Sequence, residues 1–321
     1  MESQHHDVLI VGGGIFGLST AIELNKRHYN VGLINPDKIP HPLAASTDIS
    51  KIVRMEYGSD ELYFKMAERA IEKWRQWNEV LEEELYVESG ILLLCRKPLG
   101  HAIQSYERNS YKLLRDGGYN LEVLKSEDVN RRFPHINTKY YPEAVFNAIG
   151  GYVKSSRVIE RLADYARQQG VVIYEGQTVQ QIQTRSNCVQ GVKTKEGETL
   201  SCERLVVAAG AHSPLLVKEL ASYIRVTGHP VFWIKPPETE GYEAAQMPVF
   251  TADIANSGWY GFPLHPDHGV IKFGRHTNGV AIHPDLDERR VTDAEVAEFK
   301  EFIAEAFPTL RNAPVVYTRR C

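Results

Sequence analysis

Asp7-Val-Leu-Ile-Val-Gly12-Gly-Gly14-Ile-Phe-Gly17-Leu-Ser-Thr-Ala-Ile-Glu-Leu24 is the stretch that decides the fold of this 321-residue chain. The apolar run from Val8 to Val11 predicts a buried parallel strand, and a helix is expected from Ile15. The glycines have the G-x-G-x-x-G spacing. The first permits a tight turn, the second lets a pyrophosphate approach the backbone, and the third lets the helix pack on the strand. The N–H groups and the positive dipole end of the helix point at that phosphate.

A second expected strand, Val31 to Ile34, closes a βαβ unit around this motif. The alternative is a glycine-rich turn without a ligand, which the preceding strand and the following helix disfavour. The carboxylate that usually ends the second strand and binds a ribose hydroxyl is absent, because Asn35 stands in its place. We expect Asn35 to bond the ribose, with Asp37 as a substitute carboxylate.

Size and composition predict a globular protein of two domains. The chain exceeds the usual length of one domain, and its 43% hydrophobic and 24% charged residues are normal for a globular protein. A net charge of -4, without basic runs, argues against a nucleic-acid partner. The apolar segments are too short to span a membrane. Four cysteines without a C-x-x-C pair argue against a zinc site or a redox pair and favour a reducing, intracellular compartment.

Two further segments shape the expected fold. Arg204 to Val207 reads as a second buried parallel strand, which ends at Gly210 and returns to the dinucleotide sheet. Glu61 to Leu85 has a clear helical period. We expect its buried face to comprise Leu62, Met66, Ala70, Trp74, Trp77 and Leu81.

Dinucleotide-binding segments alternate with segments of a second domain. We expect residues 1–90 and 150–221 to form the first domain, and residues 91–149 and 222–321 to form a β-rich second domain. Such interleaving is typical of flavoenzymes, whereas nicotinamide dehydrogenases usually keep a contiguous Rossmann half. The segment Ile49-Ser-Lys-Ile-Val-Arg54 places two cations among apolar residues just after the first motif. We favour a cofactor-facing segment over a surface strand with two solvated bases.

The whole chain resembles the family of monomeric sarcosine oxidase and fructosyl amino acid oxidase (amadoriase). The resemblance rests on the glycine motif, Lys51-Ile-Val-Arg54, Trp259-Tyr-Gly-Phe-Pro263, Ile271-Lys-Phe-Gly-Arg-His276 and Cys321. It implies an α/β fold of DAO or glutathione-reductase-2-like type, in which a Rossmann-type FAD-binding domain is interleaved with a β-sheet-rich substrate domain. It also implies FAD attached covalently, as 8α-S-cysteinyl FAD, through Cys321.

The same resemblance assigns roles to single residues. Lys272 falls at the lysine that activates oxygen near flavin N5, where a cation stabilises superoxide. Lys51 takes the position of a basic residue at the flavin, and Arg54 that of the arginine that grips the substrate carboxylate. Tyr260 and His276 match residues of the substrate cavity, although packing alone could explain either. The implied cofactor contacts are Gly12, Gly14, Ile15, Phe16, Gly17, Asn35, Asp37, Ser46, Lys51, Val179, Gly210 and Cys321.

The chemistry of Cys321 agrees with a covalent link, because a thiolate must attack the flavin. Arg319 and Arg320 directly precede it and are expected to favour that thiolate. The alternative is an incidental cysteine. Two departures from the family stand out: Thr47 replaces a histidine found near the flavin, and relatives continue for several dozen residues beyond this cysteine. We therefore expect 321 residues to be one segment of a longer chain, with the rest of the FAD domain after Cys321.

The sequence thus predicts an FAD-dependent amine oxidase acting on CH–NH donors. Hydride passes from an N-substituted or cyclic amino acid to flavin N5, giving an imine, and O2 reoxidises the flavin with release of H2O2. The alternatives are an NAD(P)-dependent dehydrogenase, oxidative cyclisation of an amine in secondary metabolism, or a non-catalytic flavin-binding protein. We expect a monomer in the cytoplasm or peroxisome, with no membrane, nucleic-acid or metal partner. Sarcosine-like, glycated and cyclic amino acids all remain open as substrates.

Overall fold

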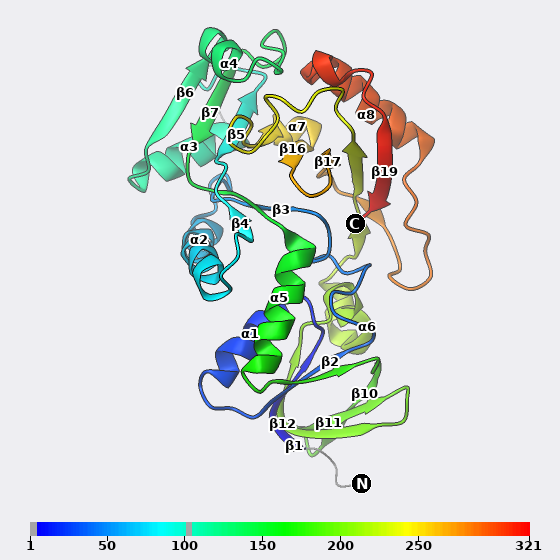
Figure 1. Ribbon diagram of the computed structural model, residues 1–321. Coiled ribbons are helices and arrows are strands. Elements are labelled where there is room, and N and C mark those ends of the chain that lie inside the picture. The colour runs from blue at the N-terminus through cyan, green and yellow to red at the C-terminus, as the bar shows by residue number, and fades with distance from the viewer. Residues whose placement is uncertain (1–4, 101–104) are drawn as a thin grey trace. The chain divides into compact units, whose positions relative to one another are not determined.

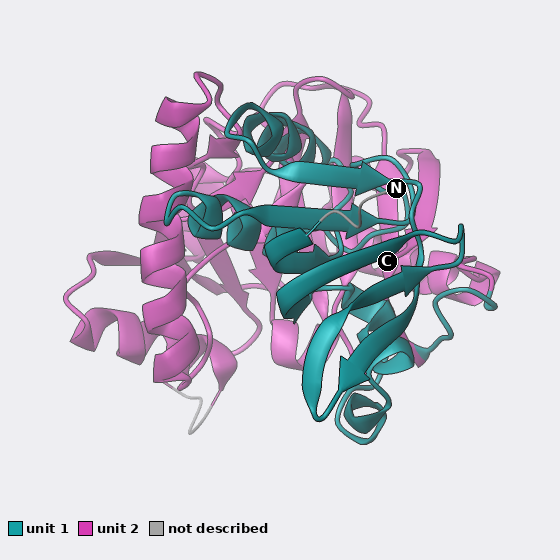
Figure 2. Cartoon of the chain, turned by 90° about the horizontal axis from the view of Figure 1, so that it is seen from below, with its two compact units in different colours: residues 1–49, 155–226, 281–287 teal, residues 50–154, 227–280, 288–321 magenta. Residues whose placement is uncertain are grey.

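The computed structural model describes residues 5–100 and 105–321, and the chain divides into two compact units. The first unit comprises residues 1–49, 155–226 and 281–287, and the second comprises residues 50–154, 227–280 and 288–321 (Figure 2). The chain therefore passes between the units several times.

A six-stranded sheet forms the first unit (Figure 1). β1 pairs in parallel with β2 on one side and with β12 on the other, and β2 pairs in parallel with β9. Helices α1 (Ile15–Asn25) and α5 (Ser155–Gln168) pack against each other. This confirms the predicted strand–turn–helix–strand order. In sheet order the strands are β10 (Val179–Arg185), β11 (Cys188–Thr194), β12 (Thr199–Val207), β1 (His5–Val11), β2 (Val31–Asn35) and β9 (Val172–Glu175).

β12 differs from the buried strand predicted at Arg204 to Val207. It is one nine-residue strand from Thr199 to Val207, and the side chains of its last three residues are half-buried. Its first half pairs antiparallel with β11, while residues from Ser201 onwards pair in parallel with β1. One continuous strand thus serves both partners, and it does return to the dinucleotide sheet. After it come η1 (Gly210–His212), α6 (Ser213–Leu216) and η2 (Lys218–Ser222).

The second unit is built on an eight-stranded sheet and a three-stranded sheet, with helices packed around them (Figure 1). In order, the large sheet contains β19 (Val315–Arg320), β14 (Pro230–Ile234), β17 (Val270–Arg275), β16 (Trp259–His265), β15 (Val249–Ala252), β5 (Ile91–Cys95), β7 (Glu143–Asn147) and β6 (Leu121–Lys125). The small sheet contains β3 (Lys51–Val53), β8 (Gly151–Val153) and β4 (Tyr86–Val87). The helices are α2 (Glu61–Val80), α3 (Tyr106–Asp116), α4 (Ser126–Arg132), α7 (Ile254–Ser257), α8 (Asp293–Ala306) and η3 (Pro308–Leu310). A further short pair joins β13 (Thr227–Gly228) to β18 (Val280–Ala281).

Alternation along β17 sets the two faces of the large sheet. Ile271 and Phe273 point into a core that includes Phe299 and Phe302 of α8. Lys272 lies between them in sequence, so its side chain leaves the opposite face. Burying aromatic rings against α8 holds this register, because a shift by one residue would place the lysine in the aromatic core.

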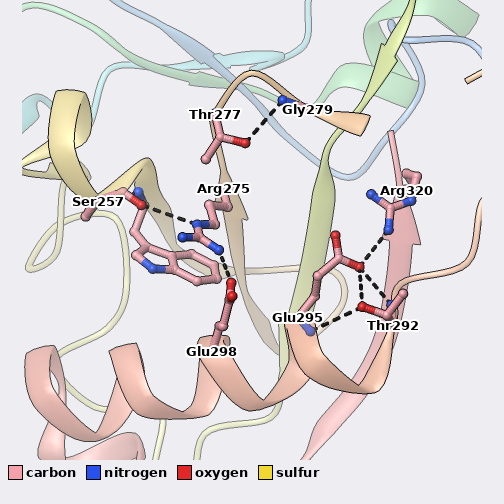
Figure 3. A network of polar contacts seen from close by, with 9 residues as sticks. Ser257, Arg275, Thr277, Gly279, Thr292, Glu295, Glu298 and Arg320 are labelled. Carbon is pink, nitrogen blue, oxygen red and sulfur yellow. Dashed lines mark hydrogen bonds and ion pairs between the residues drawn. The ribbon is translucent and has the colours of Figure 1, made fainter. Parts of the chain in front are cut away.

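α8 is tied to β19 and β17 by charged contacts (Figure 3). Thr292 and Glu295 form a capping box at the start of α8, and Glu295 also accepts a hydrogen bond from buried Arg320 at 2.6 Å. Arg275 pairs with Glu298, one turn further along the helix, and its Nε donates to the Ser257 carbonyl at 3.4 Å. A capping box of this kind stabilises a helix start by satisfying two free N–H groups.

The buried face of α2 is only partly the one predicted. Trp77 and Leu81 are buried as expected. Leu62 and Met66 are instead 67% and 57% exposed, whereas Phe64 and Ile71 are buried. The helix ends at Val80, because Asn78 turns back to the following segment. Its Oδ1 accepts the backbone N–H groups of both Leu85 and Tyr86 at 2.9 Å.

In residues 5–100 and 105–321, we find no helix with the length and apolar character required to cross a bilayer. Over the same ranges, no cluster of three or more histidine, cysteine or carboxylate side chains is arranged to hold a metal ion.

Candidate active site

The glycine turn of the first unit is built as its spacing predicts. Gly12 has a φ of 112° and donates its N–H to the Ile34 carbonyl at 2.8 Å. A Cβ on Gly17 would overlap the Gly12 carbonyl oxygen, which is backbone and cannot move aside. The third glycine therefore allows α1 to lie against the turn after β1.

The N-terminus of α1 suits a phosphate group. Gly14 is the N-cap residue and has no side chain, and the first turn carries no acidic residue. A Cβ at Gly14 would lie 3.2 Å from Ser46 Oγ, which is a tight contact, so glycine keeps this part of the turn uncrowded. Ser46 Oγ also accepts the Ile15 N–H at 3.1 Å, which ties the turn to the loop before β3. Phe16, in the first turn, is 79% exposed.

Asn35 is engaged within the chain at both ends of its amide. Its Oδ1 accepts the Gly13 N–H at 3.0 Å, and its Nδ2 donates to the Asp37 carbonyl at 2.7 Å. The buried amide thus braces the glycine turn, a role that the spacing alone did not suggest. The exposed Asp37 carboxylate accepts the Lys38 N–H at 2.8 Å. Two further predicted contacts lie in this unit: Val179 begins β10, and Gly210 is an exposed residue with a φ of 55° after β12.

Lys272 is the most deeply buried cation of the predicted site. Its side chain, only 1% exposed, donates from Nζ to the Ser50 backbone carbonyl. The Phe262 ring centroid lies 4.8 Å from the same nitrogen. A buried ammonium is retained only with such partners, because leaving water is costly for a charge.

Tyr260 shares the sheet face of Lys272, since it pairs with Gly274, two residues after the lysine. Gly274 makes this possible, because a Cβ there would overlap the Tyr260 ring. His276 is exposed and its ring stacks on that of His229, with centroids 5.4 Å apart. No sequence motif marks His229, whose backbone exchanges two hydrogen bonds of 2.8 Å with Cys321.

Lys51 and Cys321 meet, although they lie far apart in sequence. Lys51 Nζ donates to Cys321 Sγ over 3.2 Å. The expectation that Arg320 assists this thiol is wrong. Its guanidinium leaves the other side of β19, where it bonds Glu295 at 2.6 Å and the Arg290 carbonyl at 3.0 Å. Successive residues of a strand point to opposite faces, so Arg320 cannot share the face of Cys321.

Arg54 lies in a tyrosine-rich corner of the second unit. Its Nη1 donates to the Tyr106 hydroxyl, and its Cζ is 4.4 Å from the Tyr57 ring centroid. Tyr57 and Tyr106 also line a cavity of about 660 Å³. The other lining residues are Gly58, Ser59, Asp60, Glu61 and Asn109.

Two features indicate that these residues fit a flavin dinucleotide. The N-cap residue of α1, Gly14, has no side chain, and a helix N-terminus of this kind suits a pyrophosphate. In the second unit, the hydroxyl of Ser50 is buried and has no hydrogen-bond partner among the described residues. A buried hydroxyl of this kind calls for a polar group, and it belongs to the residue whose carbonyl accepts from Lys272.

The family model of FAD dependent oxidoreductases matches residues 7–321. The chain belongs to this family. FAD is therefore its cofactor, and the nicotinamide-dependent alternative is set aside. The predicted α/β fold is also confirmed, since the whole chain superposes on solved members. L-proline dehydrogenase from P. horikoshii has a TM-score of 0.84 at 20% identity, over 99% of this chain and 81% of that one. A fructosyl peptide oxidase has the same score and identity, over 100% and 79%.

Curated relatives of this FAD-dependent oxidoreductase oxidise several different amines, to judge by their names. Monomeric sarcosine oxidase from Bacillus sp. (strain B-0618) is 24% identical over 99% of this chain and 82% of its own length. L-saccharopine oxidase from Schizosaccharomyces pombe is 27% identical over 98% and 78%. N-methyl-L-tryptophan oxidase from Escherichia coli is 26% identical over 96% and 78%. The predicted resemblance to sarcosine oxidase is thereby confirmed.

Proposed function

We propose that this FAD-dependent oxidoreductase oxidises a secondary amine that carries a carboxylate, with O2 as the electron acceptor. The observation that carries the proposal is the group of Lys51, Lys272 and Cys321 in the second unit, with Lys51 Nζ 3.2 Å from the cysteine sulfur. The amine oxidases among the relatives support the reaction class. When bound, FAD supplies the acceptor for a hydride from the carbon next to nitrogen and passes the electrons to O2.

Side chains of this protein bind the substrate, favour its neutral amine and assist the reaction with O2. Arg54 binds the substrate carboxylate, for which its planar fork of donors is suited. Tyr260 and His276 are assigned to the substrate site by the family resemblance, although they are not among the residues that line the 660 Å³ cavity. Lys51 and Lys272 disfavour a protonated substrate amine by charge repulsion, so that the neutral amine reacts. The buried charge of Lys272 stabilises the anion formed when O2 takes up an electron.

We assign FAD-binding roles to residues of each unit separately. The turn from Gly12 to Gly17 receives the pyrophosphate on the N-terminus of α1. Cys321 would hold the flavin through a thioether at its 8α carbon. The S–H bond and one C–H bond would be broken, both protons would be lost, and the two electrons would pass through the flavin to O2. Lys51 would orient the sulfur. Arg54 recognises only the carboxylate in this proposal, so methylated, glycated and cyclic amino acids are distinguished by the amine panel below.

The test is an absorption spectrum of the holoprotein, repeated after acid precipitation, together with an amine panel. We expect yellow colour to stay in the pellet, and Cys321→Ser to release it to the supernatant while peroxide formation is measured separately. Sarcosine, N-methyl-L-tryptophan, L-pipecolate, L-proline and fructosyl-glycine form the panel. Peroxide release with none of them, or amine oxidation that proceeds without consuming O2, would contradict an amine oxidase. Flavin released by the unaltered protein would contradict only the thioether.

A further inference from the structure

The guanidinium of Arg54 is held by aromatic side chains from two parts of the second unit. Tyr57 follows it closely in sequence, and its ring centroid lies 4.4 Å from Arg54 Cζ. Tyr106 comes from the start of α3, with its ring centroid 5.7 Å away. Both distances are within the range of cation–π attraction. Tyr106 also accepts a hydrogen bond from Arg54 Nη1. Among the described residues, Tyr57 accepts no such bond from Arg54.

The direction of the Tyr106 hydroxyl is fixed by a second partner. The Tyr106 hydroxyl donates a hydrogen bond to the backbone carbonyl of Glu56. A phenol has only one proton, so its oxygen must act as acceptor towards Arg54. Burial raises the pKa of Tyr106 to about 12, so the hydroxyl keeps that proton at neutral pH. Apart from Nη1, the N–H groups of the Arg54 guanidinium make no hydrogen bond to Tyr106.

Glu56 is itself immobilised, which keeps its carbonyl in place. The carboxyl group is buried and accepts from Asn147 Nδ2 at 2.8 Å and from the Met55 N–H at 3.0 Å. The Tyr106 side is equally fixed. Ser105 caps α3 by accepting the Arg108 N–H at 3.1 Å.

Gly58 connects the segment after Arg54 to α3. Its N–H donates to Ser110 Oγ of α3 at 2.8 Å. A Cβ on Gly58 would lie 3.3 Å from the Tyr106 ring, which is a tight contact. The segment after Arg54 is thus tied to α3 at the point where the ring is placed.

We propose that Tyr106 is a positioning residue for Arg54: its hydroxyl and ring fix the guanidinium so that the unused donors meet the substrate carboxylate. This inference rests on the proposed function, because it takes Arg54 as the carboxylate ligand. Without the hydroxyl, the long arginine side chain regains rotamers that do not bind a carboxylate. The consequence is weaker carboxylate binding with little change in the chemical step.

The test uses the holoenzyme and acetate, a carboxylate without an amine, titrated by the change in flavin absorbance. Tyr106→Phe keeps the ring and removes the hydroxyl. We expect the Kd of acetate to rise roughly tenfold, equivalent to about 1.4 kcal/mol. KM for the best amine of the panel should rise in parallel, with kcat changed less than about twofold. In an Arg54→Lys background, the same change should have no further effect.

Tyr119→Phe is the matched control. Tyr119 lies just after the other end of α3. Its hydroxyl bonds Glu68, and its ring packs edge-on against Phe64 with centroids 5.8 Å apart. We expect acetate binding by this variant to equal that of the unaltered protein. A loss of thermal stability shared by both variants, with acetate binding unchanged in both, would overturn the positioning role.

The two proposals fail separately. If Arg54→Lys leaves acetate binding and KM unchanged, Arg54 is not the carboxylate ligand and that part of the proposed function falls. If Arg54→Lys weakens acetate binding but Tyr106→Phe does not, the proposed function stands and the Tyr106 inference alone is overturned.

Discussion

Lys51 Nζ lies 3.2 Å from Cys321 Sγ, across 270 positions of sequence. Lys51 belongs to β3 of the small sheet, and Cys321 directly follows β19 at the edge of the large sheet. The contact therefore connects the two sheets of the second unit. Because an ammonium donates to the sulfur, the cysteine has a defined position rather than that of a loose strand end.

The first prediction separates folding from cofactor binding in the glycine turn. Gly17→Ala should destabilise the protein by about 1–3 kcal/mol, because the new Cβ overlaps backbone that cannot yield. Gly14→Ala should shift Tm by less than about 2 °C but abolish FAD binding. Its backbone is in an ordinary extended conformation, and the methyl group occupies the approach of the phosphate.

Thermal unfolding of the apoprotein and flavin content after purification distinguish the two variants. Equal loss of stability in both would show that Gly14 serves only packing. Normal flavin content in Gly14→Ala would show that the phosphate binds elsewhere.

The second prediction concerns the buried charge of Lys272. Lys272→Met should slow reoxidation of the reduced flavin by O2 by about 10²–10³-fold, because the charge that stabilises reduced oxygen is lost. Flavin reduction by the amine should change far less. Stopped-flow spectroscopy measures the two half-reactions separately.

Lys235→Met is the control for the charge. Lys235 is an exposed lysine directly after β14, in the same sheet. Its replacement should leave both half-reactions unchanged. An equally slow reoxidation in both variants would mean that general surface charge, and not the buried ammonium, governs the oxygen step.

The third prediction is a pH dependence of stability from His229. Burial, and then the neighbouring His276, lower the pKa of His229 from its ordinary value of 6.5. The unfolded chain therefore takes up the proton first as pH falls, so the stability contributed by neutral His229 is present above about pH 6.5 and lost below it. His229→Gln should reduce the fall in Tm between about pH 7 and pH 5.

His268→Gln, at an exposed histidine in the turn between β16 and β17, provides the comparison. Differential scanning calorimetry at a series of pH values measures each Tm. A fall in Tm that is identical in the unaltered protein and in His229→Gln would contradict the proton linkage.

The apolar period of α2 predicted a helix but did not identify which of its sides is buried. The helix presents apolar residues on more than one stripe, and the spacing favoured the stripe with Leu62 and Met66. Tertiary packing instead buries Phe64, which meets the Tyr119 ring edge-on at 5.8 Å. Periodicity reports a helix and its apolar content, but the partner surface chooses the buried stripe.

The sequence contains a hint of the role of Glu56, but none for Tyr106 or His229. Glu56 stands two positions after Arg54, and an acid in that apolar segment was a visible candidate for a buried partner. Nothing local to Tyr106 indicated its hydroxyl contact with Arg54, which depends on how α3 docks. His229 likewise carries no motif, and only strand pairing brings its backbone to Cys321.

The sequence by itself determined the βαβ unit, the glycine turn and the α/β class, because these follow from short-range steric rules and from the period of apolar residues. Tertiary structure alone decided which side chains share a face. Lys272 and Cys321 leave one side of the large sheet and Arg320 the other, because each strand alternates and its register is fixed by the aromatic core under α8. The same long-range pairing brought Lys51 to Cys321 and Tyr106 to Arg54, since contacts between distant segments depend on the packing of whole elements and not on local spacing.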